Sequence, residues 1–301
     1  MAVLANLLTT LVLLLSALLT TDARLIKRAS LQQVKDSSIK NPTNVGFYIY
    51  VPEKLAPNPP IIVAIHFCNG NAQAYFTYSP YANLADSKGF IVLYPSSPWS
   101  GTCWDVSSKA SLTHNGGGDS NAIANFVTWA LNKYNGDPKK VFVTGTSSGA
   151  MMTNVIAAAY PDMFAAAVAY SGVAAGCFVS TSGGSNAWNN SCANGQAKAN
   201  PTQWANVVHD MYKGYTGNYP KIQIYHGSSD TTLAPNNYNE TVKQWAGVFG
   251  YSYPAQKITR NAPLNNYETD DFGPNLQGFY ATGVGHNVPI RGNDDLAFFG
   301  I

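Results

Sequence analysis

A serine between two glycines at fixed spacing is the first residue that could do chemistry. Residues 145–149, GTSSG, match the pattern G-x-S-x-G with Ser147 at its centre, after the apolar run VFVT and before a helix-like stretch. Such a tight turn excludes side chains at the glycines and forces the serine into a strained conformation that exposes its Oγ. Ser148 fails the same spacing, because position 146 is a threonine. We predict that Ser147 is a nucleophile; a glycine-flanked helix N-cap is the alternative.

A serine hydroxyl is a weak nucleophile, so the chain must also supply a histidine as base and a carboxylate to orient it. With this motif, the acid and then the histidine follow the serine along the chain. We predict that the base is His286, in the glycine-flanked segment GVGH near the end of the sequence. His209 lies in a helix-like stretch and is predicted to be a surface residue.

The acid should follow one of the last buried strands. Asp230 does so, four residues beyond His226, which directly follows the apolar run KIQIY. We predict that Asp230 is the acid and that His226 fixes its loop through a backbone hydrogen bond. Asp270 and Asp271 are competitors, but the segment ETDD that contains them is typical of a solvated hairpin tip.

Attack on an ester creates an oxyanion, which needs two preorganised N–H donors. Removing one such donor costs about 3–4 kcal/mol in comparable enzymes. We predict the backbone amide of Ser148 as one donor and that of Cys68, in the loop after the run IIVAI, as the other. A disulfide at Cys68 would hold this loop rigid. Cys68 could also be a purely structural staple, and both roles are compatible because only its backbone would do chemistry.

Alternating strands and helices must bring these groups together. An alternating pattern predicts a partly exposed strand at residues 45–51, and short apolar runs predict buried strands at residues 61–66, 90–94, 140–144, 165–170 and 221–225. Helical spacing predicts helices at residues 120–134, with Asp119 as N-cap, at 148–160 and at 237–249. This rhythm favours an α/β fold, a mostly parallel sheet covered on both faces by helices. Chemistry gathers at the carboxyl ends of the strands in such sheets.

The composition indicates an extracellular protein that acts on neutral polymers. Only 11% of the 301 residues are charged, against about 25% in average soluble proteins. The net charge of +2 is small, and the sequence has no basic stripe of the kind found in nucleic-acid-binding proteins. We therefore expect no nucleic-acid partner.

The amino-terminal residues are predicted to be removed. Residues 1–23 are typical of a secretory signal peptide, and their apolar run of residues 11–19 is shorter than the ~20 residues that a membrane span needs. Residues 24–28 predict a propeptide that ends in Lys-Arg. We expect residues 29–301 to form a single secreted catalytic domain with no carbohydrate-binding module and no membrane partner.

The four cysteines suit a secreted protein with disulfides, for which three connectivities exist. We predict the two pairings that close short loops, Cys68–Cys103 and Cys177–Cys192. The cysteine spacing does not indicate a metal site. Two sequons predict N-glycosylation at Asn189 and Asn239.

Several spaced motifs resemble one known family. IHFCNGN, CWD, GGGDSNAIANFV, VTGTSSGAMMTNV, YHGSSD and GVGH occur here in the order found in fungal acetylxylan esterases of carbohydrate esterase family 1. That family includes feruloyl esterases and is related to polyhydroxybutyrate depolymerases. The resemblance spans residue 30 to the end and implies an α/β-hydrolase fold with Ser147, Asp230 and His286 as triad. Relatives often have H-G-C where this chain has HFC at residues 66–68, which predicts a differently shaped loop.

The resemblance implies a serine esterase that removes acetyl groups from xylan through an acyl-enzyme, without a cofactor or metal and as a monomer. A feruloyl esterase is the nearest alternative, followed by a polyester depolymerase and a catalytically inactive carbohydrate-binding relative. Trp188, between Cys177 and Cys192, is predicted to line the acyl pocket or stack on a sugar. Its alternative role is a buried loop anchor.

Overall fold

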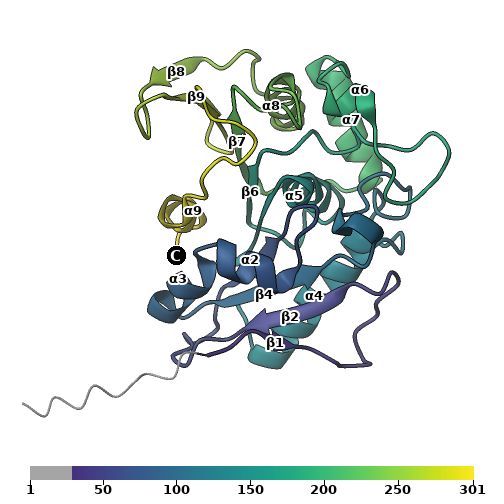
Figure 1. Cartoon of the computed structure of the whole chain (residues 1–301), viewed down its shortest axis with the longest axis vertical. Coiled ribbons are helices and arrows are strands. Elements are labelled where there is room, and N and C mark those ends of the chain that lie inside the picture. The colour runs from purple at the N-terminus through teal and green to yellow at the C-terminus, as the bar shows by residue number, and fades with distance from the viewer. Residues whose placement is uncertain (1–28) are drawn as a thin grey trace, which may run out of the picture.

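A ten-stranded sheet crosses the molecule (Figure 1), in the order β1-β2-β4-β3-β5-β6-β7-β10-β9-β8. The computed structural model describes residues 29–301. The predicted signal peptide of residues 1–23 and the predicted propeptide of residues 24–28 lie outside the described residues.

The central strands are parallel; the short apolar runs predicted five of the six, and β10 was not predicted. Parallel pairs join β4 to β3, β3 to β5, β5 to β6, β6 to β7 and β7 to β10. Continuous apolar sequence is typical of strands that are covered on both faces. These strands are β3 (Ile61–Ile65), β4 (Ile91–Ser96), β5 (Val141–Thr146), β6 (Ala166–Tyr170), β7 (Lys221–Gly227) and β10 (Leu276–Ala281).

Antiparallel strands form both edges of the sheet. They are β1 (Gln32–Gln33) and β2 (Gly46–Tyr50) at one edge, and β9 (Tyr267–Gly273) and β8 (Lys257–Arg260) at the other. The prediction of a solvated hairpin tip at residues 268–271 was wrong, because these residues lie inside β9 and pair with both β10 and β8. Their polar sequence did not predict a strand, because β9 is stabilised by pairing with β10 and β8 and not by an apolar pattern of its own.

Helices cover the two faces of the sheet separately. Alternate side chains of a strand point to opposite faces, so Ile61, Val63 and Ile65 pack with α4, α5, α7 and α8, whereas Ile62 and Ala64 pack with α2, α3 and α9. The helices are α2 (Ala72–Tyr78), α3 (Tyr81–Lys88), α4 (Asp119–Tyr134), α5 (Ser148–Ala159), α6 (Asn190–Ala193), α7 (Pro201–Met211), α8 (Asn236–Phe249) and α9 (Gly292–Phe299), with a short 3₁₀ turn at Ser100–Thr102.

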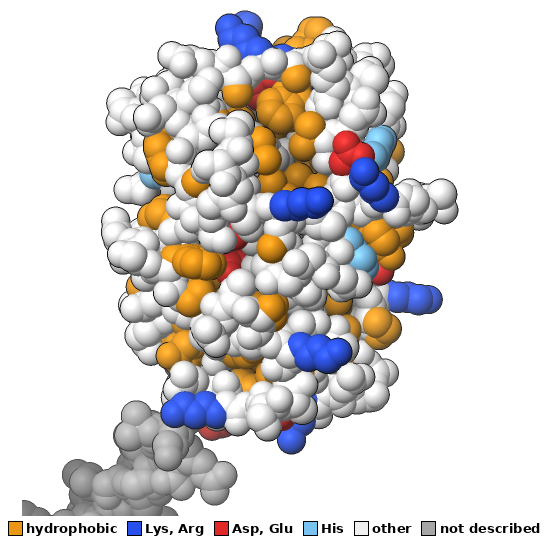
Figure 2. Space-filling view, turned by 90° about the vertical axis from the view of Figure 1, so that its right-hand side faces the viewer, with side chains coloured by type: hydrophobic (Ala, Val, Ile, Leu, Met, Phe, Trp, Pro, Cys, Tyr) orange, Lys and Arg blue, Asp and Glu red, His pale blue; other side chains and the backbone are white. Residues whose placement is uncertain are grey.

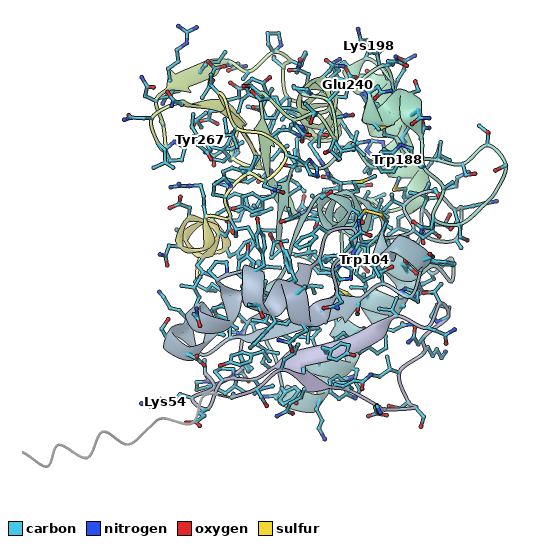
Figure 3. The ribbon with its side chains drawn as sticks, in the orientation of Figure 1. Lys54, Trp104, Trp188, Lys198, Glu240 and Tyr267 are labelled. Atoms are coloured by element: carbon cyan, nitrogen blue, oxygen red, sulfur yellow. A yellow bond between two sulfur atoms is a disulfide. The ribbon has the colours of Figure 1, made fainter. Side chains whose placement is uncertain are left out.

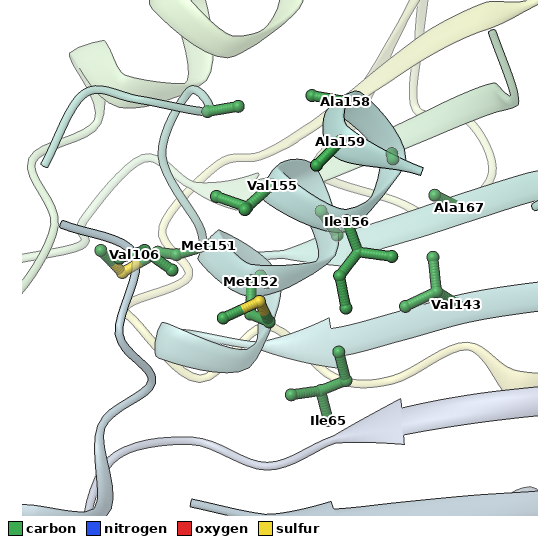
Figure 4. Close-up of a cluster of buried hydrophobic side chains, with 14 of the residues drawn as sticks. Ile65, Val106, Val143, Met151, Met152, Val155, Ile156, Ala158, Ala159 and Ala167 are labelled. Carbon is green, nitrogen blue, oxygen red and sulfur yellow. The ribbon is translucent and has the colours of Figure 1, made fainter. Parts of the chain in front are cut away.

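Helix α5 packs closely on the middle of the sheet. Figure 4 shows Met152 and Ile156 of this helix facing Ile65 of β3 and Val143 of β5. Every residue of α5 is buried. This close packing holds the amino-terminal end of α5 in a fixed position at the carboxyl end of β5.

Asp119 does not cap the following helix as predicted. Helix α4 begins at Asp119 itself, and Gly118 is its N-cap. The Asp119 carboxylate is buried, and its Oδ2 accepts hydrogen bonds from the Trp99 indole at 2.8 Å and from the Asp105 amide at 3.0 Å. The Asp119 carboxylate therefore binds donors from other parts of the chain and not, as the sequence had predicted, the first amides of α4.

The surface carries few charges. On the face drawn in Figure 2, lysines, arginines and acidic side chains are scattered among uncharged polar and apolar ones. This agrees with the low charged fraction of the sequence. Among the described residues, none of the helices has the length and apolar character needed to cross a bilayer.

Candidate active site

Ser147 lies at a strained turn between β5 and α5. Its backbone has φ 57° and ψ −121°, a conformation that L-residues rarely adopt. A Cβ on Gly145 would lie 2.4 Å from the carbonyl oxygen of Gly149, and one on Gly149 would lie 2.1 Å from that of Ile65. Both glycines are therefore needed for the turn that raises the serine above the sheet.

The structure brings Ser147, His286 and Asp230 into one hydrogen-bonded row. His286 Nε2 lies 2.8 Å from Ser147 Oγ, and His286 Nδ1 lies 2.7 Å from Asp230 Oδ2. Because the ionised carboxylate can only accept, Nδ1 carries the proton and Nε2 accepts from the serine hydroxyl. This is the geometry of a general base poised to activate a nucleophile.

Asp230 is held in its ionised form. Burial alone would raise the pKa of Asp230, but hydrogen bonds from His226, from His286 and from the Leu233 amide outweigh it and hold the pKa well below its usual range. Oδ1 accepts from the amides of Thr232 and Leu233 at 2.8 and 2.9 Å. An ionised Asp230 can stabilise the positive charge that His286 acquires when it takes the serine proton.

His226 contacts the Asp230 carboxylate directly. Its buried ring places Nε2 2.9 Å from the Leu233 carbonyl oxygen, which is the predicted backbone contact, and also 3.2 Å from Asp230 Oδ2. The direct contact with Asp230 was not predicted. Nδ1 of His226 is buried without a partner among the described residues, so the proton lies on Nε2.

The competing residues lie elsewhere in the fold. Asp270 lies in β9, where its Oδ2 accepts a hydrogen bond of 2.6 Å from the Tyr238 hydroxyl. Asp271 lies in the same strand and pairs with β10 and β8. His209 is exposed on α7. The row that reaches Ser147 contains none of the three.

The two predicted oxyanion donors line one pocket with Ser147. Ser148 is the first residue of α5, where amides have no acceptor within the helix. Across residues 29–301 no hydrogen-bond acceptor is found for the Cys68 amide. Both amides are therefore free to bind an oxygen of a substrate.

The loop that contains Trp104, for which the sequence predicted no role, supports this pocket. The backbone amide of Trp104 donates a 2.8 Å hydrogen bond to Ser148 Oγ, and the Trp104 indole donates one of 2.9 Å to the carbonyl oxygen of His66. Trp104 belongs to the CWD motif, whose cysteine is Cys103. The motif marked this segment in the sequence but did not reveal its contacts.

His66 is a buried, neutral residue of the same support. Burial lowers the pKa of His66 to about 4, despite a hydrogen bond to the Phe67 carbonyl that raises it. Its Nε2 accepts from the Ser97 amide at 3.0 Å. His66 therefore joins the ends of β3 and β4 and is not a second base.

The structure contains both disulfides that loop length predicted. Cys68–Cys103 joins the loop after β3 to the Trp104 loop, and Cys177–Cys192 closes the segment that carries Trp188. Among the described residues no cysteine is free, and no three His, Cys, Asp or Glu side chains are grouped as metal ligands.

The pocket above Ser147 has a volume of about 360 Å³. Trp188 lines it with 54% of its surface exposed, so the alternative of a buried anchor was wrong. The indole packs edge-on against Phe178 at 5.1 Å and donates to Asn190 Oδ1 at 3.0 Å. Figure 3 shows Trp188 and Trp104 reaching the same half of the molecule from different loops. The lining residues are Phe67, Cys68, Asn69, Cys103, Thr146, Ser147, Ser148, Met151, Trp188, Thr232, Leu233, His286 and Asn287.

A strained serine at the carboxyl end of a parallel sheet, in contact with a histidine that an aspartate orients, defines a serine hydrolase of the α/β-hydrolase fold. Comparison with known proteins agrees. The family model described as "Esterase PHB depolymerase" matches residues 45–261. The chain belongs to this esterase family, and the predicted fold is confirmed.

Relatives over nearly the whole chain confirm the resemblance stated from the motifs. "Probable acetylxylan esterase A" from Aspergillus clavatus is 61% identical over 95% of this chain and 93% of its own. "Acetylxylan esterase A" from Aspergillus awamori is 59% identical over 96% of this chain and 95% of its own. The solved structure "Acetyl xylan esterase from Aspergillus awamori" superposes with a TM-score of 0.88 at 60% identity, covering 90% of this chain and 99% of that one.

Proposed function

We propose that this protein is a secreted serine esterase that removes acetyl groups from acetylated xylan. The observation that carries the proposal is the contact of Ser147 Oγ with His286 Nε2 at 2.8 Å, in a chain about 60% identical to proteins named acetylxylan esterase. The contact supports ester hydrolysis through a serine nucleophile, and the relatives' names support acetylated xylan as the substrate.

In the first half of the reaction, Ser147 Oγ attacks the carbonyl carbon of the acetyl ester while His286 Nε2 takes the hydroxyl proton. The amides of Ser148 and Cys68 then donate to the negatively charged carbonyl oxygen. Donors of this kind contribute about 3–4 kcal/mol each to stabilising the transition state. Asp230 stabilises the imidazolium of His286 throughout this step.

Collapse of the tetrahedral intermediate breaks the ester bond. His286 gives its proton to the departing sugar oxygen, and the acetyl group remains on Ser147 as an acyl-enzyme. A water molecule then attacks the acyl carbon, with His286 as base again. Acetate leaves, and Ser147 regains its proton.

The pocket walls favour a small acyl group. Met151 and Trp188 bring bulky side chains to the pocket that holds Ser147, and the disulfide partners Cys68 and Cys103 line it as well. A disulfide-tethered wall cannot easily move to admit a larger group. Trp188, with its exposed indole, either bounds the acyl group or stacks on the sugar that carries it.

Further features support secretion. Two disulfides are typical of proteins from oxidising compartments, and we propose that residues 29–301 are the mature, single and monomeric domain. Asn239 is exposed on α8 and can accept a glycan. Asn189 caps α6, its Oδ1 accepting from the Cys192 amide at 3.1 Å. We propose both as glycosylation sites.

The test is to incubate the secreted protein and Ser147→Ala with acetylated xylan and with methyl ferulate. The wild type should release acetate, and Ser147→Ala should release none. Ferulate release without acetate release would replace the proposal by a feruloyl esterase. Esterase activity retained in Ser147→Ala would rule out the proposed nucleophile.

A further inference from the structure

Two of the most exposed aromatic side chains lie beside the Ser147 pocket. Across the described residues, three aromatics are at least 36% exposed: Tyr78 at 47%, Trp188 at 54% and Tyr253 at 36%. Trp188 lines the pocket, and Tyr78 contacts Phe67, which also lines it. Exposed apolar surface concentrated at a cleft is typical of ligand-binding sites.

Tyr78 is fixed in place from within the site. It is the last residue of α2, and its ring meets the Phe67 ring edge-on at 5.5 Å and the Tyr75 ring at 6.1 Å. Tyr75 is buried, and its hydroxyl lies 3.0 Å from Oγ1 of Thr146, the residue before Ser147. The position of the Tyr78 ring is thus coupled to the turn that carries the nucleophile.

The phenol of Tyr78 is available to a ligand. The Tyr78 hydroxyl makes no hydrogen bond to any described residue, although its ring is packed on one side. A ring that is supported on one side and carries a free hydroxyl can stack on an apolar face and also bind a polar group.

Aromatic surfaces lie on both sides of the nucleophile. In the sheet, β3 and β6 are the two neighbours of β5. Phe67 and α2 follow β3, and the Trp188 segment follows β6, so their loops flank Ser147 at the carboxyl ends of these strands. A chain-like substrate that crosses Ser147 between the two loops would meet an aromatic side chain on each side.

We propose that Tyr78 and Phe67 form a saccharide subsite that binds the sugar ring next to the acylated one in a neutral polysaccharide. This inference rests on the proposed deacetylation of xylan at Ser147. The apolar face of a pyranose ring packs on the Tyr78 ring, and the phenol hydrogen-bonds to a sugar hydroxyl. Asn69 and Asn287 in the pocket lining supply amide groups for other hydroxyls, and the lining contains no carboxylate, lysine or arginine to bind a charged sugar.

The first test compares a polymer with a small ester. The ratio of kcat/KM on acetylated xylan to kcat/KM on 4-nitrophenyl acetate should fall about tenfold in Tyr78→Ala, mainly through a higher KM for xylan. Tyr253→Ala is the matched control, because it removes an exposed aromatic that packs on Phe272 in β9. Its ratio should match that of the wild type. An unchanged ratio in Tyr78→Ala, or an equal fall in Tyr253→Ala, would overturn the subsite.

A second test does not depend on acetate release from xylan. Unacetylated xylo-oligosaccharides should inhibit the hydrolysis of 4-nitrophenyl acetate by the wild type, with an inhibition constant about tenfold higher in Tyr78→Ala. Tyr78→Phe keeps the ring and should lie between the two. If the wild type releases no acetate from xylan, the proposed function fails while this assay still decides the subsite. No inhibition of the wild type, or equal constants in wild type and Tyr78→Ala, would reject it.

Discussion

The side-chain hydroxyl of Ser148 accepts a 2.8 Å hydrogen bond from the backbone amide of Trp104, 44 residues earlier in the chain. Trp104 follows Cys103, which is bonded to Cys68. The two proposed oxyanion donors, the amides of Ser148 and Cys68, therefore belong to one connected unit. Ser148 would therefore have two roles: its amide is a proposed oxyanion donor, and its hydroxyl holds the Trp104 loop in place.

Replacing Ser148 by alanine tests this connection. Ser148→Ala keeps the backbone amide but leaves the buried Trp104 amide without its acceptor, which costs about 1–3 kcal/mol. We expect urea unfolding to show a free energy of unfolding that is lower by about this amount. We also expect kcat on 4-nitrophenyl acetate to fall about tenfold. The exposed Ser37 provides the control variant Ser37→Ala. A kcat equal to that of wild type would contradict the connection.

The two disulfides should contribute differently. Replacing Cys68 and Cys103 together by serine should lower the unfolding free energy by about 2–4 kcal/mol. It should also lower kcat at least about tenfold, because a mobile Cys68 amide is a weaker oxyanion donor. Replacing Cys177 and Cys192 should lower stability by a similar amount, with the larger kinetic effect in KM, since that loop carries Trp188. Identical kinetic changes in the two double variants would argue against an oxyanion role for Cys68.

Asp230 and Asp270 offer a matched pair of carboxylates. Asp230→Asn should lower kcat by about 10⁴-fold, because an amide no longer holds His286 in the tautomer that accepts the serine proton. Asp270→Asn removes a carboxylate that binds Tyr238 instead, so kcat should stay within about twofold. Initial rates on 4-nitrophenyl acetate measure both. A larger loss in Asp270→Asn than in Asp230→Asn would reassign the acid.

A buried carboxyl group should make stability depend on pH. Asp295 in α9 lies 2.6 Å from the hydroxyls of both Tyr81 and Tyr170, and burial raises its pKa to about 7, despite those hydrogen bonds that lower it. The unfolded value is about 3.9. The folded state therefore binds more protons between these values, and the stabilising contribution of protonated Asp295 declines as pH rises from about 4 to about 7.

The measurement for Asp295 is urea unfolding of the wild type and Asp295→Asn at pH 5 and pH 7. Between these values the wild type should lose about 2 kcal/mol more of its unfolding free energy than the variant, which cannot titrate. Asn retains an acceptor for one tyrosine hydroxyl. Parallel pH profiles for the two proteins would show that Asp295 does not titrate in this range.

Much of the central architecture was readable from the sequence because it depends on local rules. Continuous apolar runs mark strands that are buried on both faces, and these became β3 and β6 within one residue of their predicted bounds and β5 within two. The two glycines around Ser147 mark a turn that tolerates no Cβ, which is a property of the local backbone. The order of residues along the chain then selected Asp230 and His286. In the structure, His286 contacts both Asp230 and Ser147.

Only the tertiary structure decided where polar residues find their partners. The segment around Asp270 looked solvated, yet it pairs with two strands and binds Tyr238. Asp119 looked like a helix cap, yet it turns inward to Trp99. The Trp104 amide that binds Ser148 and the Phe67 ring that contacts Tyr78 likewise come from other loops, and no local periodicity marks these contacts. Sequence spacing thus determined the candidate reacting groups, because backbone sterics and burial act locally. Long-range packing determined how they are held, because a hydrogen bond or ring contact forms between residues that only the fold brings together.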